Sequence, residues 1–281
     1  MKFSKITAIY FFGTLILNFL CNFLICYGYI SGFITLCFLQ IFITLLVLSP
    51  IGETILRFLF GCRELKTQEE KNKLLPLFND VYKNVLKDNP NVNKKVKLYI
   101  EDNINLNAYA LGTSSIIITR GSIEQLTNEE IKGLLSHEFG HIVNGDTLLF
   151  SVLLLGNLAS LLVALFVKII QLFSRTMGSI FDGMSGSSSY GTIFADFVFN
   201  SIINLLFLIA LLIKQLHSRK AEYNADSYAV KIGYGAGLRN VLYKIHKIEF
   251  GGKIKILDRL KASHPDTVNR IEAIEKANYY N

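Results

Sequence analysis

No charged residue interrupts the sequence from Ile6 to Gly52, and this feature limits most strongly what the chain can fold into. A helix needs about 20 apolar residues to cross the hydrocarbon core of a bilayer, so the stretch is long enough for two spans. The segment YGYISG at 27–32 offers a turn between them. A cleaved secretory signal would have a shorter apolar region that ends at a small-residue cleavage site. We therefore predict that residues 1–52 form a retained transmembrane hairpin.

Two further apolar stretches lie in the second half of the chain, at about 147–167 and 192–213, with a Gly- and Ser-rich loop between them. The alternative is that they are buried helices of a soluble core, but their length favours lipid. The composition agrees, since 51% of the residues are hydrophobic and only 18% are charged. The sequence thus predicts four transmembrane helices, with the second pair in residues 147–213.

The positions of the basic residues predict the orientation. Of the 29 Lys and Arg residues, 27 fall in 1–5, 50–146 and 214–281, which a four-span arrangement places on one side. Lys and Arg residues close to the ends of spans favour the cytoplasmic side. We therefore expect a multi-pass protein of the cell membrane, with both termini and the polar segments 53–146 and 214–281 in the cytoplasm. This topology accounts for the net charge of +7, so we predict no nucleic-acid partner.

The two polar segments carry helix and strand signals. Capping-box patterns at Thr67–Glu70 and Thr127–Glu130 predict the starts of two helices. The β-branched runs KVKLYIED and SIIITRG predict strands. Helices are expected at 218–233, at about 237–248 and at 265–277.

The helix that starts after Thr127 contains the pattern H-E-x-x-H, formed by His137, Glu138 and His141. Residues four apart lie on one face of a helix, so both imidazoles can bind one metal ion. Glu138 can then lie beside a metal-activated water and take its proton. The pattern is typical of zinc-dependent peptide hydrolysis, although two solvated histidines on a charged helix would give the same letters.

A catalytic zinc usually has three protein ligands, so a third is needed. The other histidines and Asp146 are alternatives, but Glu222 in SRKAEYNAD is the better candidate. Glu222 and Asp226 are four residues apart and face the same way on a helix. One carboxylate can bind zinc while the other accepts a hydrogen bond from a ligating histidine.

Several segments together resemble the HtpX-type membrane metallopeptidases, which are related to the CAAX prenyl proteases. The segments are the apolar pairs and NAYALG (107–112), SHEFGHIVNGD (136–146), SRKAEYNAD (218–226) and SHPDTVNRI (263–271). The resemblance implies that the residues at 137, 141 and 222 bind one Zn²⁺ per chain and that Glu138 is the general base. It also implies cleavage of damaged or misfolded membrane proteins.

The comparison suggests roles for three more residues. His264 and Arg270 could stabilise the oxyanion of the tetrahedral intermediate. The alternatives are a helix-start histidine and an arginine that pairs with an acid for stability. Asn107 precedes a presumed edge strand, which could bind an extended peptide substrate through its backbone, or it is a turn asparagine.

The predicted fold is a mainly α membrane protein with four spans and a cytoplasmic, gluzincin-like α+β peptidase domain that has a small sheet. The predicted function is a membrane-bound zinc endopeptidase that acts on polypeptides, in contact with the lipid bilayer. The alternatives are a CAAX-type prenyl protease and a catalytically inactive relative that binds membrane proteins without cleaving them. The motif places the metal at the cytoplasmic face, because Glu129, Glu130 and Lys132 would be costly in lipid.

Overall fold

The computed structural model of this chain describes residues 49–147, 219–251 and 267–279, together with isolated positions in the first 46 residues. Within this described part, no helix combines the length and the hydropathy that crossing a membrane requires. The predicted spans fall almost entirely outside the described residues, and so does His264. The number of spans and their orientation therefore stay predictions.

Both capping boxes begin helices, as predicted. Thr67 caps α4 (Gln68–Asp88), and its hydroxyl accepts a hydrogen bond from the N–H of Glu70. Thr127 caps α6 (Asn128–Asn144) in the same way through Glu130. In each case the glutamate side chain accepts a hydrogen bond from the cap N–H, so two end groups that a helix leaves unpaired are satisfied locally.

Four strands form a mixed sheet in the order β1-β2-β4-β3, so the expectation of a small sheet in an α+β domain is confirmed. They are β1 (Cys62–Arg63), β2 (Lys97–Glu101), β3 (Ala108–Leu111) and β4 (Ser115–Thr119). β2 and β4 are parallel, while β1 and β3 are antiparallel to their neighbours. The predicted strand at 115–121 ends earlier, because Thr119 caps a short helix, α5 (Arg120–Gln125).

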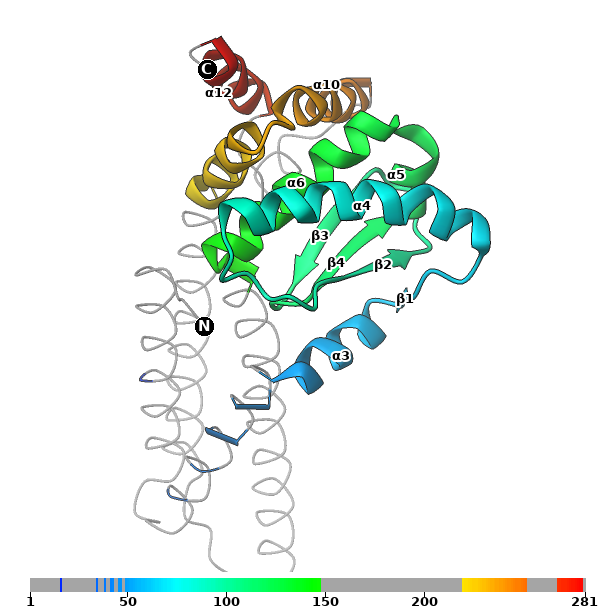
Figure 1. Cartoon of the computed structure of the whole chain (residues 1–281), viewed down its shortest axis with the longest axis vertical. Coiled ribbons are helices and arrows are strands. Elements are labelled where there is room, and N and C mark those ends of the chain that lie inside the picture. The colour runs from blue at the N-terminus through cyan, green and yellow to red at the C-terminus, as the bar shows by residue number, and fades with distance from the viewer. Residues whose placement is uncertain are drawn as a thin grey trace, which may run out of the picture.

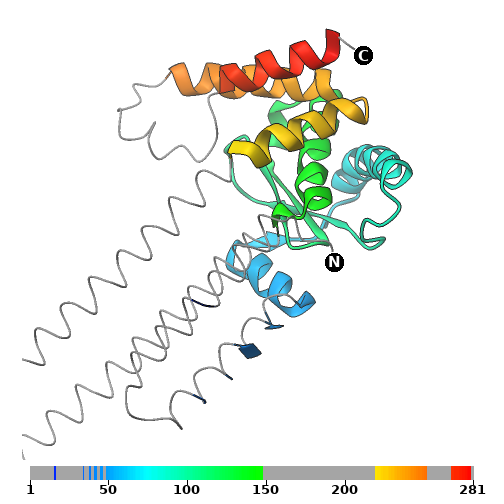
Figure 2. The ribbon, with the colours of Figure 1, turned by 90° about the vertical axis from the view of Figure 1, so that its left-hand side faces the viewer.

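Helices cover both faces of the sheet (Figures 1 and 2). The apolar sides of α4 and α6 pack on one face, where Leu98, Ile116 and Ala110 belong to the same buried core as Phe139 of α6. Sequence reasoning did not predict α3 (Pro50–Leu59), which lies against the other face. There the guanidinium of Arg57 lies 4.6 Å from the centre of the Tyr99 ring.

Three helices lie in the described residues after position 218. They cover 219–231, α10 (Gly235–Gly251) and α12 (Thr267–Tyr279), close to the ranges that the sequence predicted. α10 packs on both α6 and α12. A smaller buried core joins the three helices and consists of Ala229, Leu238, Leu242, Ile271 and Ile274. The C-terminal segment is thereby fixed against the helix that carries the histidine pair (Figure 1).

Candidate metal centre

The two histidines of α6 point toward the same spot. His137 and His141 lie one turn apart, and their rings are 4.7 Å apart and nearly perpendicular. Their Nε2 atoms are 3.2 Å from each other. His137 is buried and His141 is half-buried, so the pair lies at the edge of the core rather than on an open helix face. The reading as two solvated surface histidines is therefore wrong.

Glu222 reaches this pair because two helices approach each other closely. A Cβ on Gly140 would lie 2.8 Å from the Cα of Ala225, so only glycine allows this contact between α6 and the 219–231 helix. One oxygen of Glu222 lies 3.4 Å from Nε2 of His137, and the other lies 3.7 Å from Nε2 of His141. Residues from both polar segments thus form one cluster.

The three side chains fit a zinc ion. Their ligand atoms all lie within 4.8 Å of one another. Four ligands at about 2.0–2.1 Å in a tetrahedron are roughly 3.3–3.4 Å apart. The closest separations here, 3.2, 3.4 and 3.7 Å, are near that value. Two imidazoles and one carboxylate are also a donor set that suits zinc and leaves one tetrahedral position for water.

Each histidine meets an acid on its other ring nitrogen. Nδ1 of His137 lies 2.9 Å from Asp226, which was predicted to orient a ligating histidine. Nδ1 of His141 lies 3.4 Å from Asp146. Such outer carboxylates fix the tautomer that leaves Nε2 free to bind a metal. Asp146 was considered only as a direct ligand; it directly follows Gly145, the left-handed C-cap that ends α6 one turn after His141.

Arg270 is held by two acids of the same cluster. Its Nε and Nη2 donate to the two oxygens of Asp226, each at 2.7 Å, and its Nη1 lies 2.9 Å from Glu222. All three guanidinium nitrogens therefore contact carboxylates. This is the alternative in which the arginine pairs with an acid, while the oxyanion role stays a prediction. Arg270 links Glu222 to Asp226 and thus holds both carboxylates in position.

Charge and burial act against each other at this site. Burial lowers the pKa of His137, but contacts with Asp226 and Glu222 outweigh it and raise the pKa to about 10. Burial also raises the pKa of Asp226, yet Arg270 and His137 together keep it below its usual value. The carboxylates of the cluster therefore stabilise positive charge beside them, and a bound metal ion would supply such a charge.

Glu138 is buried next to the histidines, only 5% exposed. Its charge helps to raise the pKa of Arg270, so its carboxylate lies near the same cluster. This position suits the predicted proton-transfer role, which needs a carboxylate beside the metal-binding groups.

Asn107 lies on the surface just before β3, which forms one edge of the four-stranded sheet. Its backbone N–H donates to Ser122, and its carbonyl accepts from Thr119 and Ser122. These bonds fix the entry to β3. The backbone of Asn107 is therefore already used within the domain, and any substrate contact must come from its side chain or from β3 itself.

A buried H-E-x-x-H pair joined by a distant glutamate is an arrangement typical of zinc-dependent peptidases. Comparison with known proteins leads to the same class, since Peptidase family M48 matches residues 79–278. The chain belongs to this peptidase family, and the resemblance inferred from the sequence is confirmed.

Two relatives are each named Protease HtpX. The one from Chromohalobacter salexigens is 26% identical over 197 residues, which cover 62% of this chain and 63% of that protein. The one from Xanthomonas campestris is 26% identical over 202 residues, covering 64% and 65%. The chain thus spans less than two thirds of the length of the relatives it matches.

Among solved structures, the crystal structure of S. mikatae Ste24p is similar, with a TM-score of 0.51 and 20% identity. The match covers 95% of this chain and 63% of that one. At this identity the likeness shows the fold.

Proposed function

We propose that this chain is a membrane-anchored, zinc-dependent endopeptidase. The observation that carries the proposal is the convergence of His137, His141 and Glu222 from separate segments. Zinc would be held by these three side chains, one ion per chain. When bound, it would supply Lewis acidity and a water with a pKa near neutrality.

The residues around this centre have separate roles in the proposal. Glu138 takes the proton from the attacking water and passes it to the departing amine. Asp226 and Asp146 hold the imidazoles in the tautomer that presents Nε2. Arg270 holds Glu222 and Asp226 in place. The predicted oxyanion role of His264 is also part of the proposal.

The edge strand β3 suits an extended polypeptide substrate. It pairs with β4 on one side, and it packs against α6, which carries Glu138. An added peptide strand would bind mainly through its backbone, so sequence preference would be loose. The side chain of Asn107 would make further contacts with the bound peptide.

The membrane part of the proposal rests on the apolar stretches. Two pairs of helices would cross the bilayer, one in the predicted hairpin ahead of α3 and one in 147–213, and the basic residues would keep the peptidase domain and both termini in the cytoplasm. A peptidase held there is placed to cleave misfolded or damaged membrane proteins.

The decisive experiment compares Glu138→Gln with wild type for zinc content and for cleavage of casein. We expect zinc to be retained and the rate to fall by roughly 10²–10⁴-fold, because the base is lost and the ligands are not. Glu129→Gln is the matched control, since Glu129 lies on the same helix with a side chain that is 73% exposed. It should leave the rate unchanged.

Two outcomes would contradict the proposal. Cleavage that a chelator does not slow would exclude the metal mechanism, and absence of cleavage by the wild type would favour the inactive relative. A farnesylated peptide in the same assay distinguishes the proposed endopeptidase from a prenyl protease. A prenyl protease would cleave that peptide and leave casein intact.

A further inference from the structure

The helix α3 exposes one apolar face. Ile51, Ile55, Phe58 and Leu59 are 60, 37, 83 and 60% exposed. At about 100° per residue they fall within a stripe roughly 100° wide. No charged side chain lies in this stripe, because the two charged residues of α3 point elsewhere.

The opposite face of α3 is locked onto the turn between β3 and β4. Glu53 accepts from the N–H of Thr113 at 2.6 Å and from the hydroxyl of Ser115 at 3.1 Å. Arg57 donates to the same hydroxyl at 2.7 Å. A Cβ on Gly112 would collide with Glu53, so the carboxylate is seated tightly. The apolar stripe is therefore held outward by the fold.

The stripe continues a pattern that begins upstream. Six described positions ahead of α3 are helical and carry large apolar side chains that are 43–70% exposed: Ile16, Ile34, Phe38, Ile41, Phe42 and Leu45. The helix does not run on unbroken, because Ser49 is extended and caps α3 before Pro50. The chain thus restarts as a new helix where the charge-free stretch ends.

The length of α3 decides between possible partners. Its 10 residues are about 15 Å long, half of the roughly 30 Å that a span requires. One face of such a helix is also small beside the roughly 800 Å² per partner of a standard protein interface. A short helix with an apolar face and a polar face suits the boundary between lipid headgroups and acyl chains.

We propose that α3 lies in the plane of the bilayer surface, with Ile51, Ile55, Phe58 and Leu59 in the acyl boundary. Through Glu53 and Arg57, this helix sets the height of the β3–β4 hairpin, and hence of the edge strand, above the membrane. The inference rests on the membrane attachment in the proposed function and adds a lipid-binding surface on the peptidase domain itself.

Tryptophan fluorescence tests this inference directly, because the chain contains no tryptophan. Phe58→Trp in the full-length protein would be reconstituted into phosphatidylcholine vesicles, with and without bromine on the acyl chains. We expect the brominated lipid to quench at least half of the emission. Tyr243→Trp on α10, where Tyr243 is 48% exposed, is the control and should not be quenched.

Flotation of the vesicles separates the two proposals. If the Phe58→Trp protein floats and its emission is not quenched, α3 does not lie in lipid and the inference is wrong, while membrane attachment stands. A blue-shifted but unquenched emission that depends on protein density would assign the face to a second copy instead. If the protein does not float, membrane attachment fails and the inference fails with it. Leu59→Trp, on the same face, replaces Phe58→Trp if that variant does not fold.

Discussion

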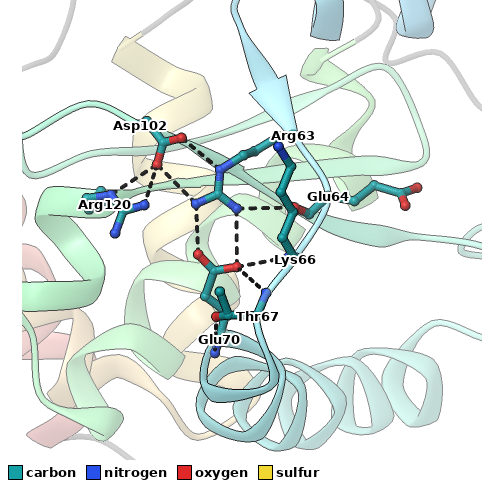
Figure 3. Close-up of polar contacts among 7 residues, drawn as sticks. All are labelled: Arg63, Glu64, Lys66, Thr67, Glu70, Asp102 and Arg120. Atoms are coloured by element: carbon teal, nitrogen blue, oxygen red, sulfur yellow. Dashed lines mark hydrogen bonds and ion pairs between the residues drawn. The ribbon is translucent and has the colours of Figure 1, made fainter.

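Two clusters in this molecule join arginine to carboxylates, and they differ in burial. In the half-exposed cluster, Arg63 donates to Glu70 and Asp102, which also accepts from Arg120 (Figure 3). The side chains of Asp102 and Arg120 are 50 and 46% exposed, while those of Arg63 and Glu70 are 17 and 15% exposed. In the metal-centre cluster, the side chains of Arg270, Asp226, Glu222 and His137 are 2–7% exposed.

Similar contacts therefore have different consequences in the two clusters. The Arg63 cluster joins β1, α4 and the loop after β2. Because water solvates part of this cluster whether or not its ion pairs form, these pairs add little to the stability of the fold. Around Arg270 the side chains have little access to solvent, so a charge that loses its partner is poorly compensated and each charge depends on the others. The buried cluster is suited to hold ligands rigidly, and the half-exposed one to join surface segments.

The largest expected difference between the two clusters is the stability that each loses when its arginine is replaced. Arg270→Met leaves two buried acids without their cation, and we expect a loss of about 3–5 kcal/mol, or about 6–20 °C in Tm. Arg63→Met should lose about 1 kcal/mol or less. Thermal unfolding of both metal-free variants in detergent measures this, and equal losses would remove the distinction between the clusters.

The second largest expected difference between the two clusters is the effect of a mutation on zinc affinity. Asp226→Asn keeps the shape of the side chain but weakens its hold on Nδ1 of His137, and we expect zinc affinity to fall roughly 10–100-fold. The control is Asp102→Asn, which should leave the affinity unchanged. Competition with a chromophoric chelator measures both. An unchanged affinity in Asp226→Asn would show that the carboxylate does not orient the ligand.

The smallest expected effect is a pH dependence in the half-exposed cluster. The hydrogen bond from Arg63 lowers the pKa of Glu70 from its usual 4.5 to about 2. Because the folded-state pKa is the lower one, Glu70 adds stability above pH 4.5, and this stability is lost as the pH falls toward 2. The difference in Tm between wild type and Glu70→Gln should therefore shrink on acidification. A constant difference down to about pH 3 would refute the linkage.

Most elements of the peptidase domain could be predicted from local sequence. The capping boxes at Thr67 and Thr127 mark helix starts, because the cap and its partner are only three residues apart. The strands β2 and β4 were recognisable from β-branched runs. In contrast, β1 has only two residues, and α3 lies across the end of the apolar stretch, where no periodic signal separates it from a span.

Spacing along the chain was enough to predict that His137 and His141 share one helix face. The same reasoning placed Glu222 and Asp226 on one face of another helix. The motifs were enough to indicate the family. Helix spacing can be read locally, since backbone hydrogen bonds between near neighbours fix it. The approach of Glu222 to the histidines, and its link to Asp226 through Arg270, exist only in the folded chain. These contacts depend on how closely α6 and its neighbour pack at Gly140, and packing between distant segments leaves no local pattern in the sequence.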